Sequence, residues 1–310
     1  MVHHSTQILT VDDGHKIHTQ LWQPHGVPTA IIQVVHGLGE HADRYARFAA
    51  AAVERGYAVC AHDHRGHGRH AEHPGYFSVS KGWDRVVNDV DVVNEFVRQT
   101  LPGVPVVLLG HSMGSYIAQN FAMYHSARLA GLILSASTWP PKLKLLPAFV
   151  IAHIEAWRLG ASANSQLLHK LGFSDFNKPF NPARTDLDWL TRDEDEVDKY
   201  IADPLCGGPY TCGLWRDLFG GLLQIYSDNS LRRISSELPI LITGGELDAV
   251  GGDKGMGKLA MRYAQTLHSR LKVRIYPEGR HEMLNETNRD EVTRDWLDWI
   301  DATTGTSRSG

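Results

Sequence analysis

Hydrophobic residues along the chain follow two patterns that alternate. Short, continuous apolar runs are typical of strands buried on both faces, whereas apolar residues recurring every three or four positions predict helices. The alternation of the two favours an α/β fold with a mostly parallel central sheet and helices on both of its faces. The runs that we predict to be core strands are residues 30–35, 57–61, 106–109, 129–135, 238–243 and 271–276.

Three predicted helices lie between these runs, and a fourth ends the core. Their apolar faces fall in residues 45–53, 83–97, 116–124 and 292–300. We expect Asp43 to cap the first of them, because an aspartate oxygen can accept a hydrogen bond from the free N–H groups of a helix start. Before the first core strand, Asp12-Asp13-Gly14 joins two strand-like runs, residues 8–10 and 15–22, and predicts a hairpin.

Residues 139–212 interrupt the alternation between two core strands. The stretch is too long for an ordinary loop, so we expect an inserted, mainly helical cap. Its residues 145–157 are predicted to form a helix that either packs on the core or acts as a lid touching lipid. Its acidic residues 193–198 are predicted to be a solvated helix face. The expected division is a core of residues 1–138 and 213–303, a cap of residues 139–212 and a flexible tail of residues 304–310.

Composition and charge narrow the class of protein. The 310 residues carry a formal net charge of −4, which provides no basic surface, so we expect no nucleic-acid partner. The N-terminus lacks the features of a signal peptide and no run is long enough to cross a bilayer, so we expect a cytoplasmic protein, at most peripheral at membranes. Three cysteines are too few for a disulfide framework. Cys60 is expected in the core, and Cys206 and Cys212, which could pair, are expected to be free thiols.

A strand-to-helix turn carries the clearest chemical signal. Gly110-His-Ser-Met-Gly114 matches the pattern G-x-S-x-G and lies between the run 106–109 and a predicted helix. In this context the serine sits on a strained turn with its hydroxyl above the sheet, and the two glycines allow close packing. Ser112 is therefore the candidate nucleophile.

A serine hydroxyl needs a base, and the base needs an acid that orients it. After a nucleophile of this kind, the acid and then the histidine follow in the sequence. Asp248 comes shortly after the run 238–243, and His281 after the run 271–276. Both would lie at the strand ends on the same edge of the sheet as Ser112, so we predict Asp248 as the acid and His281 as the base.

Other residues compete for these two roles. Glu246 and Asp253 lie close to Asp248 in the sequence and are rival acids. His111 is a rival base among 18 histidines. It is disfavoured because the side chains of neighbouring residues diverge on a tight turn.

A glycine-rich turn ends the first core strand. His36-Gly-Leu-Gly39 would let a backbone N–H approach the reacting carbonyl, as in an oxyanion loop of the HGGG type. The predicted oxyanion donors are the backbone N–H groups of Leu38 and Met113.

Two further patterns suggest ligands that we do not expect. Histidines at 62, 64, 67, 70 and 73 are dense, but no set of carboxylates or cysteines completes a metal sphere. Gly252-Asp-Lys-Gly-Met-Gly-Lys258 approaches a phosphate-loop pattern, but the next residue, Leu259, lacks the hydroxyl that binds magnesium. We expect no cofactor and no metal.

Taken together, the motifs resemble those of the α/β-hydrolases of the monoacylglycerol lipase and lysophospholipase group, which includes the serine aminopeptidase-like hydrolases. The resemblance spans nearly the whole core. It implies Ser112 as nucleophile, His281 as base and Asp248 as acid. It also implies Leu38 and Met113 as oxyanion donors, a structural turn at residues 63–68, and a cap that sets substrate choice. The matching segments are His36-Gly-Leu-Gly-Glu-His41, Asp63-His-Arg-Gly-His-Gly68, Gly110-His-Ser-Met-Gly114, Gly245-Glu-Leu-Asp248 and Gly279-Arg-His-Glu282.

From the resemblance and the apolar cap we expect a serine hydrolase that cleaves carboxylic esters through an acyl-enzyme. Monoacylglycerols or lysophospholipids are the favoured substrates, within a broader class of carboxylic esters. An apolar cap would desolvate an acyl chain and would permit transient contact with a membrane surface. An aminopeptidase-like peptidase is an alternative that needs an acidic subsite for the substrate amine. A non-catalytic ligand receptor on the same fold is a second alternative, disfavoured because every member of the relay is present.

Overall fold

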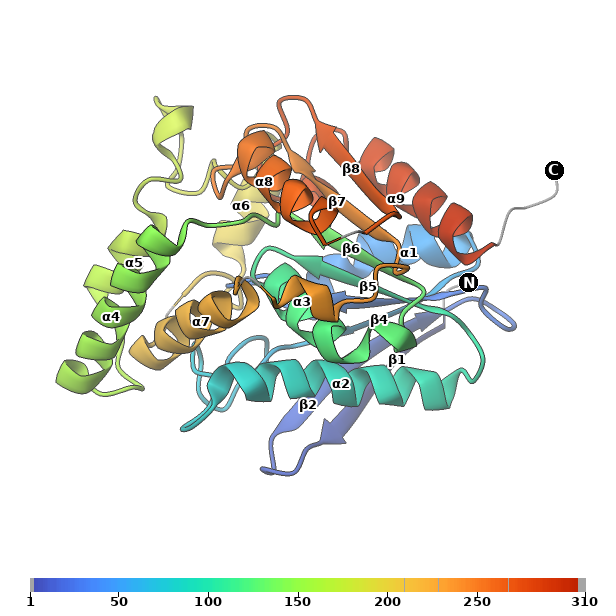
Figure 1. The fold of residues 1–310 in the computed structure, drawn as a ribbon, viewed down its shortest axis with the longest axis horizontal. Helices are drawn as coiled ribbons and strands as arrows, with labels where there is room; N and C mark the ends of the chain where they lie inside the picture. The colour runs from blue at the N-terminus through green and yellow to red at the C-terminus, as the bar shows by residue number, and fades with distance from the viewer. Residues whose placement is uncertain (1–2, 209, 228, 267, 306–310) are drawn as a thin grey trace.

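A single eight-stranded sheet forms the centre of the computed structural model, which describes residues 3–208, 210–227, 229–266 and 268–305 (Figure 1). The strand order is β1-β2-β4-β3-β5-β6-β7-β8. The pairs β1–β2 and β2–β4 are antiparallel and the other neighbours are parallel, which confirms the predicted mostly parallel sheet. The strands are β1 (His3–Thr10), β2 (Lys16–Gln23), β3 (Ile31–Val35), β4 (Ala58–His62), β5 (Val106–His111), β6 (Gly131–Ser135), β7 (Ile240–Gly245) and β8 (Leu271–Tyr276).

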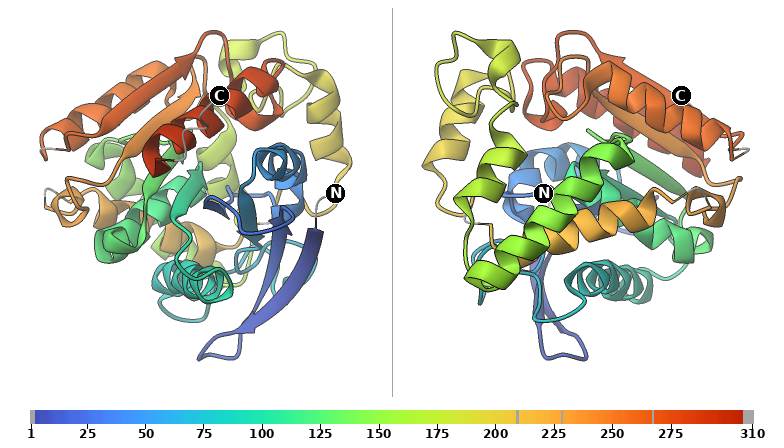
Figure 2. Two further views of the ribbon diagram at one scale, coloured as in Figure 1. Left: turned by 90° about the vertical axis from the view of Figure 1, so that its right-hand side faces the viewer. Right: turned by 60° about the vertical axis from the view of Figure 1, so that its left-hand side comes forward.

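Helices cover both faces of the sheet, as the continuous apolar strands require. Helices α1 and α9 pack on one face, and α2, α3 and α8 pack on the other (Figures 1 and 2). Side chains of β5 alternate between these layers: Val106 and Leu108 face α2 and α3, whereas Val107 and Leu109 face α1 and α9. The helices are α1 (Ala46–Glu54), α2 (Gly82–Thr100), α3 (Met113–His125), α4 (Lys142–Leu159), α5 (Gln166–Phe173), α6 (Glu194–Ala202), α7 (Cys212–Ile225), α8 (Gly252–Ala264) and α9 (Arg289–Thr304).

The first helix begins differently from the prediction. Asp43 lies inside a short 3₁₀ helix, Ala42–Tyr45, that precedes α1, and no side chain caps α1 among the described residues. The Asp43 carboxylate instead accepts a hydrogen bond from Gln20. Asp63 acts at this helix start, because its Oδ1 accepts the N–H of Ala42 at 2.9 Å. The predicted capping role of Asp43 is therefore wrong.

Helices α4, α5 and α6 lie between β6 and β7, on the side of the molecule away from the two chain ends (Figures 1 and 2). The predicted apolar helix 145–157 is part of α4. The acidic stretch begins α6, where Asp195 and Asp198 are exposed as predicted, but Glu196 is buried. Glu196 pairs with Arg47 of α1 at 2.9 Å, so this helix face is only partly solvated.

Two other expectations concern thiols and membranes. All three cysteines are free, and Cys60 is fully buried, as predicted. Within the described ranges, no helix is both long and apolar enough to cross a membrane.

Candidate active site

The turn between β5 and α3 holds Ser112 in a strained conformation. Its φ of 49° and ψ of −119° lie in a region that residues with side chains rarely adopt. The flanking glycines make this turn possible. A Cβ at Gly114 would lie 2.0 Å from the carbonyl oxygen of Val35, and one at Gly110 would lie 2.6 Å from that of Gly114. The sequence motif thus forms the predicted strand-to-helix turn, which presents the serine at the carboxyl end of β5.

Asp248 and His281 meet at the same edge of the sheet. Asp248 follows β7 and His281 follows β8, and the neighbouring strands β5, β6, β7 and β8 all run parallel in this order. The Nδ1 atom of His281 lies 2.8 Å from Oδ1 of Asp248, and both side chains are buried. The rival acids bind elsewhere. Glu246 accepts the N–H of Glu278, and Asp253 accepts the N–H of Lys254.

The imidazole of His281 also lies near the serine turn. Its ring centre is 4.9 Å from that of His111, the residue before Ser112. Among the described residues no hydrogen bond joins Ser112 Oγ to the imidazole, so that contact stays a prediction. Such catalytic contacts are often loose without substrate and tighten in the complex.

The pKa values of the two histidines at this edge shift in opposite directions, although both rings are buried near the same carboxylates. Burial disfavours a charged His281, but the charge and hydrogen bond of Asp248, helped by Glu282 and Glu40, raise its pKa above the usual value. Burial lowers the pKa of His111, and the proximity of His281 lowers it further. His281 is thus the more basic of the two, in agreement with its predicted role.

The glycine-rich turn after β3 approaches the serine closely. A Cβ at Gly37 would lie 3.3 Å from the Cβ of Ser112 and 2.9 Å from Oε1 of Glu40. The N–H of Gly37 is held by Oε1 of Glu40 at 2.5 Å. Leu38, the next residue, is half-buried, and Met113 is the first residue of α3, where backbone N–H groups lack partners within the helix. Their roles as oxyanion donors stay predictions.

Two buried histidines fasten this turn to the loop after β4. The N–H of His64 donates to Nε2 of His36 at 3.0 Å, and Nε2 of His64 lies 3.1 Å from the carbonyl oxygen of His36. Burial and neighbouring histidines hold the pKa of both rings well below the usual value. Arg65 pairs with the buried Asp89 of α2 and with Asp13 of the first hairpin, so it fixes the same loop to both elements. This supports the structural turn that the resemblance implied for residues 63–68.

A buried charged network behind the site was missed in the sequence. Arg44 contacts Glu282 through the two terminal nitrogens of its guanidinium group, at 2.6 and 2.7 Å, and contacts Glu40 at 3.2 Å. Burial opposes ionisation of Glu282, but Arg44 lowers its pKa to about 2. The network borders a cavity of about 20 Å³, enough for one water molecule. Glu40 and Glu282 belong to the motifs that carry the resemblance, so their position beside Leu38 and His281 was the available signal.

The segment before α6 covers the base. The ring of Trp189 lies 5.0 Å from that of His281, and the N–H of Glu282 donates to the carbonyl oxygen of Leu190 at 2.8 Å. Residues inserted between β6 and β7 therefore form part of the wall around the site.

Comparisons with known proteins identify the family of this chain. The sequence profile of the family described as "Serine aminopeptidase, S33" matches residues 26–288. Human monoglyceride lipase is 30% identical, and the alignment covers 95% of this chain and 91% of the lipase.

Two solved structures show the same fold. A thermostable carboxyl esterase from Bacillus coagulans, crystallised with glycerol, superposes with a TM-score of 0.90 at 25% identity, covering 97% of this chain and 99% of the esterase. Monoglyceride lipase from Saccharomyces cerevisiae, in complex with a substrate analogue, gives a TM-score of 0.74 at 20% identity, covering 96% and 95%. The chain belongs to the serine aminopeptidase S33 family of α/β-hydrolases and is a monoacylglycerol lipase-like member of it.

Proposed function

We propose that this chain, a carboxylic ester hydrolase of the monoacylglycerol lipase and esterase type, forms an acyl-enzyme on Ser112. His281 accepts the serine proton as Oγ attacks the acyl carbonyl, and Asp248 holds the imidazole and stabilises its charged form. The protonated His281 then donates its proton to the leaving alcohol. A water molecule, activated by the same imidazole, releases the acid.

The N–H groups of Leu38 and Met113 are proposed to stabilise the negative oxygen that develops in both steps. Each such donor typically contributes about 10²- to 10³-fold in turnover. The observation that carries the proposal is the buried Asp248–His281 pair at 2.8 Å beside the strained serine turn.

The experiment compares p-nitrophenyl esters of increasing acyl length, a monoacylglycerol and aminoacyl amides. We expect esters to be hydrolysed faster than amides, and Ser112→Ala to lower kcat by about 10⁴-fold or more. Ser80→Ala, at an exposed serine, is the matched control and should keep full activity. Faster turnover of the amides would instead support the peptidase alternative, and activity retained by Ser112→Ala would reject Ser112.

The outer face of α4 supports a lipid-like substrate and contact with a membrane surface. Leu143 and Trp157 are each 86% exposed, and Leu146, Val150 and Ile154 are about half exposed. Their spacing places all five on one side of the helix, and exposed apolar patches of this kind mark lipid or protein contacts. We propose that this face rests on the lipid surface from which substrate enters.

Co-sedimentation with phosphatidylcholine vesicles tests the contact. Replacing Leu143 and Trp157 together by serine should weaken vesicle binding by about tenfold or more, because burial of each side chain contributes about 1.5–3 kcal/mol. The matched control replaces Val27 and Val79 together by serine. Both residues are 86% exposed but lie outside the insert. Equal loss in the control, or no loss in the α4 variant, would contradict the proposal.

A further inference from the structure

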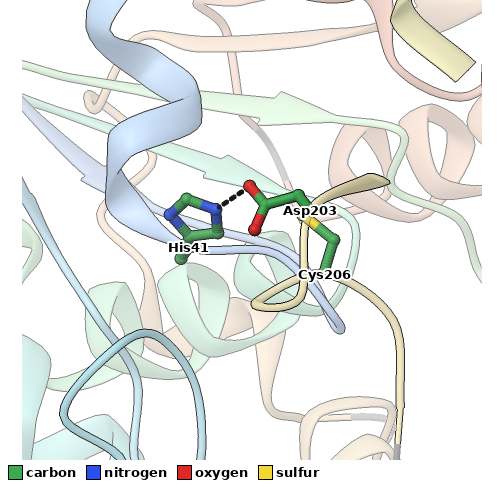
Figure 3. Close-up of side chains that lie close together, drawn as sticks. All are labelled: His41, Asp203 and Cys206. Carbon is green, nitrogen blue, oxygen red and sulfur yellow. Dashed lines mark hydrogen bonds and ion pairs between the residues drawn. The ribbon is translucent and has the colours of Figure 1, made fainter. Parts of the chain in front are cut away.

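Three side chains that can bind metal meet where the insert contacts the turn after β3. The Nε2 atom of His41 lies 2.9 Å from Oδ2 of Asp203, and the Sγ atom of Cys206 completes a group whose donor atoms are all within 4.8 Å of one another (Figure 3). His41 is 4% exposed, and the other two are half-buried. The group lies outside the Ser112–His281–Asp248 site.

The backbone presents two of the donors from one turn. The N–H of Cys206 donates to the carbonyl oxygen of Asp203 at 3.0 Å, and the N–H of Leu205 donates to Oδ1 of Asp203 at 2.9 Å. This turn brings the carboxylate and the thiol together facing His41. The Asp203 carboxylate is hydrogen-bonded to both His41 and the Cys206 side chain, so a cation held by the three groups would replace these contacts.

The donor types select the kind of cation. Nitrogen, carboxylate oxygen and sulfur together suit Zn²⁺, whereas Mg²⁺ and Ca²⁺ prefer oxygen alone. Zinc binds these atoms at about 2.0–2.3 Å, so modest side-chain rotations would suffice to reach it. With three protein ligands, a fourth position stays available to water.

The surroundings favour a positive ion. The Oδ2 atom of Asp43 lies 3.7 Å from Nδ1 of His41, as expected of a carboxylate that supports a metal-bound histidine. Behind the group, Glu40 and Glu282 supply two negative charges against the single positive charge of Arg44.

We propose that His41, Asp203 and Cys206 form a zinc site that joins the insert to the turn carrying Leu38. The sequence-based expectation of no metal considered only the clustered histidines. It missed this group because His41 and Asp203 are 162 positions apart. The site exists independently of the proposed acyl-enzyme, since none of its residues takes part in that chemistry.

Cobalt serves as the spectroscopic probe for the test. The full-length protein, freed of metal with a chelator, is titrated with Co²⁺, and we expect the near-ultraviolet charge-transfer band of a cobalt–thiolate bond, followed by its loss on addition of Zn²⁺. Cys206→Ser should abolish the band, and Asp203→Asn should weaken cobalt binding by about tenfold or more. Mg²⁺ should not displace cobalt.

Cys212→Ser is the matched control, because Cys212 is a second free thiol of the same region and is not in the group. It should keep the band and the affinity. A band that persists in Cys206→Ser, or zinc affinity that is equal in the wild-type protein and both ligand variants, would overturn the proposal. Circular dichroism and thermal unfolding without metal check whether each variant is folded.

Activity provides a second readout. Because zinc would draw His41 toward Asp203 and Cys206 and so displace the neighbouring turn that carries the proposed oxyanion donor Leu38, we expect Zn²⁺ to lower ester hydrolysis several-fold in the wild-type protein and less in Cys206→Ser. Without metal, Cys206→Ser should be as active as the wild type. Equal inhibition of the two proteins would contradict the coupling, while the cobalt spectrum would still report on the site.

Discussion

The two parts of the insert differ in how they meet the rest of the molecule. The outer part, residues 142–173, packs through α4 on α7 and turns an apolar face to solvent. The inner part, residues 189–206, is joined by polar contacts to the loops around His281 and Gly39 and to the first turns of α1 and α9. These contacts are His281 N–H to Trp189 O, Glu282 N–H to Leu190 O, Arg192 to Glu286, Arg289 to Asp193, Arg47 to Glu196, Tyr200 to Gly39 O and His41 to Asp203.

This difference indicates that the two parts of the insert have different roles. Polar contacts have strict geometry, so the inner part can hold the catalytic loops in place. Apolar contact is non-directional, so the outer part can change its partner, for example from solvent to lipid, without loss of specific bonds. We expect perturbations of the inner part to reach the stability of the core, and perturbations of the outer face to leave it unchanged.

The largest expected difference between the two parts is in their stability at low pH, which should fall more in the inner part than in the outer part. Hydrogen bonding to Arg289 lowers the pKa of Asp193. At Glu196 and Asp203, burial raises the pKa, but hydrogen bonds to the carboxylates lower it by more. Both pKa values therefore also lie below the usual ones. Groups with a depressed pKa stabilise the fold above their unfolded values of 3.8 and 4.5, and that stability is lost as pH falls through the folded pKa.

Hydrogen exchange of backbone amides, corrected for its intrinsic pH dependence, measures this loss of local stability. Between pH 6 and pH 3, protection of residues 189–206 should fall further than that of residues 142–173. The outer part has one carboxylate with a lowered pKa, Glu155, which binds Ser165 and Arg158 within the same part. Equal loss of protection in both parts would remove the distinction.

Breaking one ion pair of the inner part should have the next largest effect. Nε of Arg192 lies 2.9 Å from Oε2 of Glu286, whose side chain is completely buried. Arg192→Met would leave that charge without its cation, so the free energy of unfolding should fall by roughly 3 kcal/mol. Unfolding in urea measures this change in the free energy of unfolding. Arg184→Met, which breaks an exposed pair with Asp198, should cost about 1 kcal/mol or less, and a similar cost for both variants would argue against an anchoring role.

Removing one hydroxyl tests a smaller contact of the same part. Tyr200 donates to the carbonyl oxygen of Gly39 at 2.8 Å and accepts the N–H of Gly207 at 3.1 Å. Tyr200→Phe should lower the free energy of unfolding by about 1–2 kcal/mol, since the contact with Gly39 is buried and the one with Gly207 is partly buried. Tyr124→Phe, at an exposed tyrosine, should change it by less than about 0.5 kcal/mol. No difference between these variants in thermal unfolding would show that the contact contributes nothing.

The outer face should give the smallest change in stability. Leu143→Ser and Trp157→Ser, which weaken vesicle binding under our proposal, should each shift the free energy of unfolding by at most about 0.5 kcal/mol. The inward-facing Leu145 is 5% exposed, so Leu145→Ala on the same helix should cost about 2–5 kcal/mol. If the outward substitutions destabilise as strongly as Leu145→Ala, this face is covered by protein and not by solvent or lipid.

The core could be predicted from the sequence because its signals are local. Apolar runs located the parallel strands, and the chain order placed Asp248 and His281 at one edge with the serine turn. The first strand was found only in part: β1 begins at His3, five positions before the predicted start. As an edge strand it exposes most of its side chains, so no apolar pattern marks residues 3–7.

The polar network and the contacts of the insert could not be predicted in this way. Arg44 and Glu282 form a pair across 238 positions, and nothing near either residue indicates the other. The same holds for His41 and Asp203. Asp43 was misplaced because the acid that serves the helix start, Asp63, comes from a strand end elsewhere in the chain. Long-range pairing of charged side chains depends on the completed fold, which periodicity does not describe.

The backbone at Ser112 also limits which nucleophiles this scaffold can carry. At a φ of 49°, a side chain branched at Cβ would clash with its own backbone. Cysteine or aspartate could occupy the position, but threonine could not, although its hydroxyl has the same chemistry as that of serine. Evolution or design can therefore replace the reacting atom here from oxygen to sulfur more easily than it can add a single methyl group.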